Sequence, residues 1–135
     1  MKLKTSRFGE LEVEEEKIIS FADGLVGLSG MKQFILVDHR DTPLKWLQSV
    51  DDPDIAFIVA TPDTMKVNLS LELDNAVRQH LQLENDSDLV IFVTVRVQGE
   101  DVVANFQGPL LLNAGNRRGI QLVLDGQSRI LHKSE

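Results

Sequence analysis

The chain has 135 residues, of which 42% are hydrophobic and 26% charged, and its formal net charge is −7. This composition is typical of one packed globular domain and excludes bulk disorder. The absence of cysteine excludes disulfides and thiolate metal sites. The negative charge opposes long-range attraction to nucleic acid and to anionic membranes, and it would attract a basic protein. Acidity also serves solubility alone in many proteins, so the charge by itself identifies no partner. No signal peptide or membrane span is visible, so we expect a cytoplasmic protein.

The first part of the chain predicts short strands separated by turns. Alternation of polar and apolar residues predicts strands over residues 2–6 and 11–13, and further strands are expected over 17–21 and 33–37. The loop between the last two, at residues 23–30, contains three glycines. Their spacing matches neither a dinucleotide-binding fingerprint nor a phosphate-binding loop, so we interpret this loop as structural.

Two apolar runs, at residues 44–50 and 55–60, flank the acidic segment Asp-Asp-Pro-Asp at 51–54. Asp and Pro are strong turn formers, so the segment predicts a strand–turn–strand unit. The second run is apolar on both faces, which indicates a central strand. The only tryptophan, Trp46, lies in the first run, and we expect it in the core because a buried indole contributes strongly to a small core.

A strand at residues 65–71 precedes the one convincing helix, at residues 74–82. Apolar residues recur every four positions in this helix, and Asp74 is suited to cap its first turn. Further strands are expected at residues 89–98, 102–106, 110–112 and 120–124. The dipeptide Gly108-Pro109 is expected to interrupt the chain between two of them, and the polar tail from Asp125 is expected to be loosely held.

Many short strands at regular spacing with a single helix predict a mainly β protein. The specific expectation is a small antiparallel β-barrel, or a split barrel, with one short α-helix around residues 74–82. The scarcity of aromatic residues favours a tight interior of Val, Leu and Ile, and therefore a closed barrel.

The residues that enzymes use do not form a recognisable catalytic or metal-binding pattern. His39, His80 and His132 fall in separate predicted segments, and none belongs to a nucleophile motif. The acidic segment 51–54 lacks the alternating oxygens, the glycine and the closing glutamate of a calcium loop. We therefore expect no catalytic residue, metal or cofactor, and a function in binding another protein. A nucleic-acid-binding barrel and a small-ligand or flavin barrel remain alternatives, although the basic residues are dispersed.

Four stretches are shared with one known family. They are Arg7-Phe8-Gly9-Glu10; Phe21 with Asp23-Gly24-Leu25 and Gly27; Lys45-Trp46-Leu47-Gln48-Ser49 with Asp51-Asp52-Pro53; and Asn113 with Asn116-Arg117-Arg118-Gly119. Together they span nearly the whole chain and resemble the bacterial flagellar assembly factor FliW family. The Trp-Leu-Gln-Ser segment joined to Asp-Asp-Pro is the most specific of them.

The resemblance implies a single FliW-like domain over residues 1–135 that acts as a non-enzymatic regulator without a cofactor. It implies two protein partners. One is CsrA, an RNA-binding translational repressor that is thereby kept off flagellin mRNA. The other is flagellin, whose binding releases the repressor. The acidic balance of the chain fits a basic RNA-binding partner.

Two groups of polar residues at predicted strand ends are the expected partner surface. The acidic segment matches the family and carries the sign of charge that suits the rim of an interface with a basic partner. The expected partner-binding residues are Gln48, Asp51, Asp52, Asp54, Asn113, Asn116 and Arg117. The sequence leaves open whether the partners share one surface or favour different arrangements of the protein.

Overall fold

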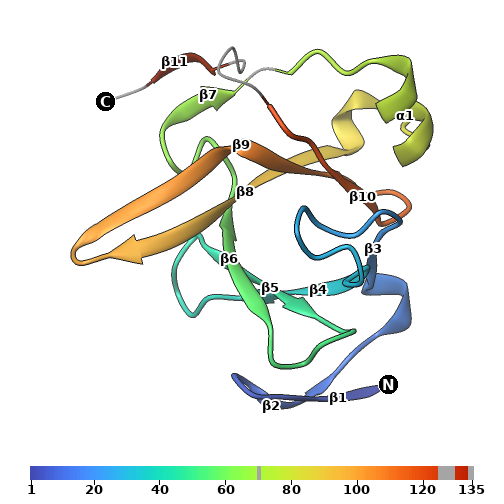
Figure 1. Ribbon diagram of the computed structural model, residues 1–135, viewed down its shortest axis with the longest axis vertical. Helices are drawn as coiled ribbons and strands as arrows, with labels where there is room; N and C mark the ends of the chain where they lie inside the picture. The colour runs from blue at the N-terminus through green and yellow to red at the C-terminus, as the bar shows by residue number, and fades with distance from the viewer. Residues whose placement is uncertain (70, 125–129, 134–135) are drawn as a thin grey trace.

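The computed structural model describes residues 1–69, 71–124 and 130–133, and a closed barrel of seven strands lies at its centre (Figure 1). In barrel order, the strands are β10 (Arg118–Gln121), β3 (Ile19–Phe21), β4 (Gln33–Asp38), β5 (Lys45–Ser49), β6 (Ala56–Ala60), β8 (Leu89–Gln98) and β9 (Asp101–Asn113). Neighbouring strands pair antiparallel, except that β10 and β3 pair in parallel. The predicted mainly β barrel is confirmed, and this parallel pair belongs to its closed ring.

The remaining elements lie outside the barrel. The hairpin of β1 (Lys2–Thr5) and β2 (Gly9–Glu12) lies on one side, and α1 (Asn75–Leu81) lies on the opposite side (Figure 1). The strands β7 (Val67–Leu69) and β11 (Ile130–Lys133) form a second small antiparallel sheet. Two 3-10 turns, η1 (Glu15–Lys17) and η2 (Asp86–Asp88), precede β3 and β8.

The barrel interior is filled by apolar side chains that alternate with outward-facing residues along the strands. Its core residues are Ile19, Phe21, Leu25, Phe34, Leu47, Val59, Phe92, Leu110 and Leu112. The rings of Phe21 and Phe34 meet edge to face with their centroids 5.6 Å apart. A Cβ on Gly119 would lie 2.8 Å from the Phe21 ring, so β10 can pair beside β3 because this position has no side chain.

Two further apolar clusters attach the outer elements to the barrel. Leu3 and Val13 pack with Ile35 of β4, which fixes the β1–β2 hairpin on the outer face of the sheet. On the other side, Leu81 of α1 is fully buried and packs with Leu111 of β9. Burial of these apolar surfaces holds the helix and the hairpin in place, since neither is long enough to be stable alone.

The predicted helix is confirmed with its cap. The Asp74 side chain accepts a hydrogen bond from the Val77 amide at 2.9 Å, and Gln82, which caps the end of the helix after Leu81, has a left-handed backbone with φ +51°. Among the described residues, no helix combines the length and apolar character that crossing a membrane requires.

Trp46 differs from its expected position. It pairs with Val37 on the outer face of the barrel, whereas the adjacent Leu47 points into the core. The indole is half-buried. The prediction that Trp46 is a core residue is therefore wrong, because the strand alternates between two apolar faces and the run of hydrophobic residues does not reveal which face is inside.

Three predicted segments also differ from the structure. The Gly108-Pro109 dipeptide does not end a strand: β9 continues through it, and the irregularity appears as a register shift opposite Phe92 and Thr94. Of the strand expected at residues 65–71, Val67–Leu69 forms β7, residues 65, 66 and 71 lie outside it, and residue 70 lies outside the described residues. In the tail expected to be loosely held, Ile130–Lys133 pairs with β7 as β11. Residues 125–129 and 134–135 of that tail lie outside the described residues.

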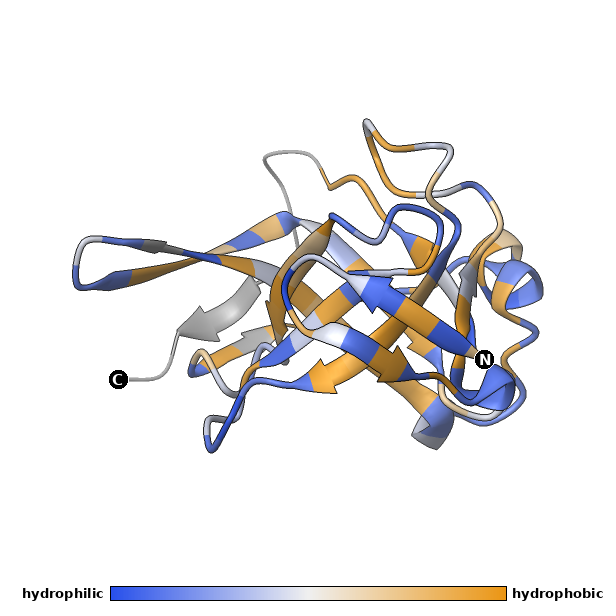
Figure 2. Cartoon of the chain, turned by 90° about the horizontal axis from the view of Figure 1, so that it is seen from below, coloured by the Kyte–Doolittle hydropathy of each residue, from blue (hydrophilic) through white to orange (hydrophobic). Residues whose placement is uncertain are grey.

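The hairpin of β8 and β9 extends well beyond the barrel as a two-stranded arm (Figures 1 and 2). Hydrophilic residues lie at its tip, and hydrophilic and hydrophobic residues alternate along its strands (Figure 2). The pairing of β8 with β6 ends at Val95, so no strand in the described part of the chain pairs with the outer part of the arm on that side.

Candidate partner-binding surface

The acidic segment forms the turn between β5 and β6, and Gln48 holds it from inside. The Gln48 side chain is fully buried, and its Nε2 donates to the carbonyls of Ser49, Pro53 and Ile55 at 2.9, 3.0 and 3.1 Å. A partner does not reach this side chain directly. Gln48 instead fixes the backbone on which the aspartates stand.

The three aspartates of the turn differ in their exposure and in the groups that they bind. Asp51 is exposed, and its Oδ2 accepts from the amides of Lys32 and Gln33 at 2.6 and 2.8 Å, which ties the turn to the start of β4. Asp52 is half-buried and accepts from the Asp54 amide at 3.1 Å. The carboxylate of Asp54 is exposed and accepts a hydrogen bond from the hydroxyl of Ser6.

The second predicted group lies in the turn between β9 and β10. Asn113 is 4% exposed, and its Nδ2 donates to the carbonyls of Leu81 and Gln82 at 3.0 and 3.1 Å, while its Oδ1 accepts from the Gly115 amide at 2.9 Å. Asn116 is exposed and also donates to the Leu81 carbonyl, at 2.9 Å. The two asparagines therefore satisfy the carbonyls of Leu81 and Gln82 at the end of α1, while the His80 carbonyl accepts from the Arg118 guanidinium at 3.4 Å.

Arg117 lies in the same turn but presents its side chain differently. Its backbone is left-handed with φ +63°, its amide donates to the Asn113 carbonyl at 2.8 Å, and its carbonyl accepts from the Ser20 amide at 2.9 Å. These bonds lock the turn against β3. The half-buried side chain of Arg117 lines an apolar cavity at this end of the barrel.

The structure brings the residues together within each group and keeps the two groups apart. The acidic turn contacts the β1–β2 hairpin through Ser6, whose amide donates to the Pro53 carbonyl at 3.4 Å. The β9–β10 turn contacts α1 instead. In the described part of the chain, no hydrogen bond or ion pair joins one turn to the other.

A cluster around Trp46 was not predicted as a site. The Arg7 guanidinium lies 4.4 Å from the indole centroid, His39 stacks on the ring at 5.4 Å, and Phe8 meets it edge-on at 5.8 Å. Arg, Trp and other aromatic residues are enriched where protein interfaces bind most strongly. The sequence contained a signal for this cluster, because Arg7, Phe8 and Trp46 all lie in the stretches that carry the family resemblance.

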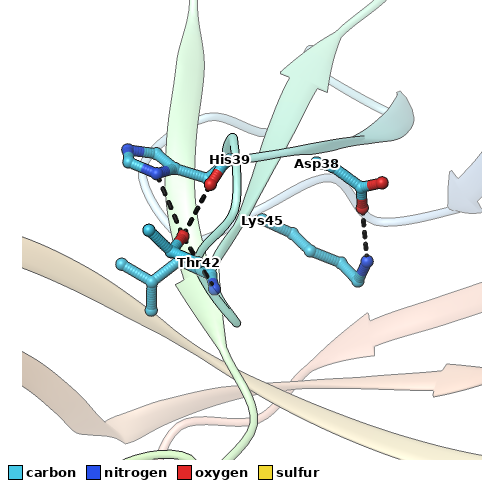
Figure 3. A network of polar contacts seen from close by, with 5 residues as sticks. Asp38, His39, Thr42 and Lys45 are labelled. Carbon is cyan, nitrogen blue, oxygen red and sulfur yellow. Dashed lines mark hydrogen bonds and ion pairs between the residues drawn. The ribbon is translucent and has the colours of Figure 1, made fainter.

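The turn between β4 and β5 is closed by local polar contacts (Figure 3). The Thr42 hydroxyl donates to the His39 carbonyl at 2.6 Å, and Lys45 Nζ pairs with Asp38 Oδ1 at 2.7 Å. The hydrogen bond from Lys45, together with its charge, holds the pKa of the Asp38 carboxyl below its ordinary value. Among the described residues, no three His, Asp or Glu side chains gather as a metal site would require.

These observations define a class of protein: a small closed β-barrel that presents polar turns at its strand ends and a Trp-centred cluster on its outer face. The family model described as FliW protein matches residues 2–134, so the chain belongs to the FliW family.

Relatives and a solved structure agree with this assignment. The flagellar assembly factor FliW of Caldanaerobacter subterraneus subsp. tengcongensis is 36% identical over 135 residues, covering 97% of this chain and 90% of the relative. The protein of the same name from Treponema denticola is 35% identical, with 98% and 92% covered. A crystal structure of the flagellar assembly factor FliW superposes with a TM-score of 0.87 at 29% identity, and covers 98% of this chain and 96% of that chain.

Proposed function

We propose that this protein is a non-enzymatic regulator of flagellar assembly that acts in the cytoplasm by binding CsrA and flagellin. The observation that carries the proposal is family membership over nearly the whole chain, with relatives named flagellar assembly factors. CsrA and flagellin are the partners that the family resemblance implies. Binding of CsrA would keep this repressor off flagellin mRNA, and flagellin would release it again.

The charge of the chain supports a basic partner. The formal net charge is −7, and the exposed carboxylates of Asp51 and Asp54 stand on a turn whose backbone is fixed from inside by Gln48. A preorganised acidic turn of this kind speeds encounter with a basic protein and loses little conformational entropy on binding. We assign Asp51, Asp52 and Asp54, supported by Gln48, to the partner surface.

The β9–β10 turn is the second part of the proposed surface. Asn116 and Arg117 are at least partly accessible, whereas the buried Asn113 holds the turn against the end of α1. The two turns make no direct bond to each other. Competition between the partners would therefore require that one partner is broad enough to cover both turns, or that the protein shifts between two conformations. By linkage, if flagellin weakens the hold on CsrA, CsrA weakens the hold on flagellin by the same factor.

A competition titration tests the partner switch. Fluorescently labelled CsrA is bound to this protein, and purified flagellin is then added, with an unrelated acidic protein of similar size as the control. We expect flagellin to release labelled CsrA while the control does not. A stable ternary complex whose CsrA affinity is unchanged at saturating flagellin would contradict the switch and leave a two-partner scaffold.

A further inference from the structure

A small apolar cavity opens at the end of the barrel beside the β9–β10 turn. Its volume is about 150 Å³. Its walls include Ile19, Phe92 and Leu112 of the barrel core, together with Leu36 and Val90, which pack against that core. The exposed Ala114 and the half-buried Arg117 also line it, so its rim lies in the β9–β10 turn.

The dimensions and lining of this cavity suit one apolar side chain. A dry cavity of roughly 150 Å³ lined by aliphatic and aromatic residues holds a group of the size of benzene. The buried Asn113 also lines this cavity, but its amide is engaged by the Leu81 and Gln82 carbonyls and by the Gly115 amide. The cavity therefore favours a Leu, Ile or Phe side chain over a polar one.

Among the described residues, the charged groups around the cavity mouth are paired except for one cation. An adjoining groove of about 450 Å³ shares Leu36 and Arg117 with the cavity. The other charged residues that line this groove are paired. Their pairs are Glu12 with the amino terminus at 3.4 Å, Glu14 with Lys17 at 3.3 Å, and Asp38 with Lys45 at 2.7 Å.

Arg117 is the exception in this set. Within the part of the chain that the structure describes, no hydrogen bond or ion pair reaches its guanidinium, although its backbone is locked at both the amide and the carbonyl. An Arg side chain on a fixed backbone presents a planar fork of donors that matches a carboxylate. Its charge complements an acidic group at a point of the groove where no described residue balances it.

We propose that this cavity binds one aliphatic or aromatic side chain of a partner protein, and that Arg117 binds an Asp or Glu carboxylate adjacent to that side chain. The inference rests on the proposed function in protein binding and adds the chemistry of the segment that this end of the barrel recognises. It gives Arg117 a different role from the acidic β5–β6 turn, which favours basic groups.

Short peptides test the proposal without either named partner. The probes are acetyl-Gly-Phe-Glu-Gly-amide, its Phe-Gln analogue, and the free acid 3-phenylpropionate, each titrated into the full chain with labelled methyl groups. We expect the Phe-Glu peptide to shift the methyl resonances of Ile19, Val90 and Leu112, and to bind about tenfold more tightly than the Phe-Gln peptide, since the charged acceptor strengthens the hydrogen bonds.

Two variants assign the charge preference to one side chain. Arg117→Gln is expected to abolish the difference between the two peptides while keeping the methyl shifts. Arg118→Gln, the matched control on an exposed neighbour that does not line the cavity, is expected to preserve the difference. Glutamine suits position 117 because Gln82 already adopts a similar left-handed backbone in this chain.

Three results would overturn the inference. They are the absence of methyl shifts with every probe, binding of 3-phenylpropionate without binding of either peptide, and an equal preference for the Phe-Glu peptide in Arg117→Gln. The first would show a cavity closed in solution, and the second would indicate a free small acid in place of a protein segment. None of them would affect the capture of CsrA or flagellin, so failure of this inference is distinguishable from failure of the proposed function.

Discussion

Trp46 shows how one residue combines stability with recognition. Its indole covers the outer face of the barrel and is itself covered by Arg7, Phe8 and His39. A half-buried indole of this kind contributes less to stability than one in the barrel interior, and it presents the remaining surface to solvent. Trp46 therefore contributes to the stability of the fold and remains accessible to a partner.

We expect Trp46→Ala to lower the free energy of unfolding by about 2 kcal/mol, below the roughly 3–5 kcal/mol typical of a fully buried aromatic. Trp46→Phe, the control that keeps a ring in the cluster, should lose less than half as much. Urea denaturation followed by far-UV circular dichroism is the suitable measurement, because Trp46 is the only tryptophan and its fluorescence is lost with it. A loss of 4 kcal/mol or more on this same scale would place the indole in the core after all.

At the scale of elements, the β9–β10 turn is held to α1 by side-chain amides. Asn113 supplies two bonds to the last carbonyls of the helix from a buried position, and Asn116 supplies one from an exposed position. Removal of the buried amide leaves the Leu81 carbonyl with the bond from Asn116 alone, and it takes away the side-chain partner of the Gln82 carbonyl and of the Gly115 amide. Water can replace the exposed amide of Asn116 but not the buried amide of Asn113.

We therefore expect Asn113→Ala to cost about 2–3 kcal/mol and Asn116→Ala less than about 1 kcal/mol. Amide hydrogen exchange at residues 75–81 should accelerate strongly in the first variant and only slightly in the second. Equal exchange in the two variants would show that the end of the helix does not depend on the buried amide. The comparison matters for binding studies, because lost binding in Asn113→Ala reports a loosened turn and not a lost contact.

The sequence predicted the elements whose signals are local. Asp74 marks the start of α1 because its capping bond is formed within one turn, and the turn at 51–54 is predicted because Asp and Pro define it by their own backbone preferences. Gly108-Pro109 was interpreted wrongly for the same reason. A local breaker signal was outweighed by pairing with β8 and by the bond from the Leu122 amide to the Pro109 carbonyl at 3.0 Å.

The site was predictable only in part, because its residues meet through long-range contacts. The sequence placed Gln48 and Asn113 at strand ends, but it could not show that both side chains are buried and act through backbone carbonyls. It gave no signal that Arg117 would stand beside Ile19 and Phe92, which are distant in sequence and meet only when the barrel closes. Composition and turn chemistry are enough to predict the barrel class. Which side chains meet on the partner-binding surface depends on the strand register, which the sequence does not reveal.

At the scale of the whole molecule, charge governs approach and the turns govern contact. The formal net charge of −7 attracts a basic partner from any direction, so a change in net charge alone alters encounter. To separate a local role of the β5–β6 turn from this general attraction, a variant of the turn must be compared with a variant that loses the same charge at another site. The exposed residues Glu15 and Glu16 of η1 provide that comparison.

We expect Asp51→Asn with Asp52→Asn to slow association with CsrA about threefold at low salt, and the difference from the unmodified protein to fade as ionic strength rises. The asparagines retain an oxygen that can accept the bonds from the Lys32 and Gln33 amides and from the Asp54 amide, so the turn should keep its shape. The control, Glu15→Gln with Glu16→Gln, removes the same number of charges and should slow association much less. Stopped-flow mixing at several salt concentrations measures both. Equal slowing in the two variants would reduce the effect to net charge, and unchanged rates in the aspartate variant would remove the acidic turn from the interface.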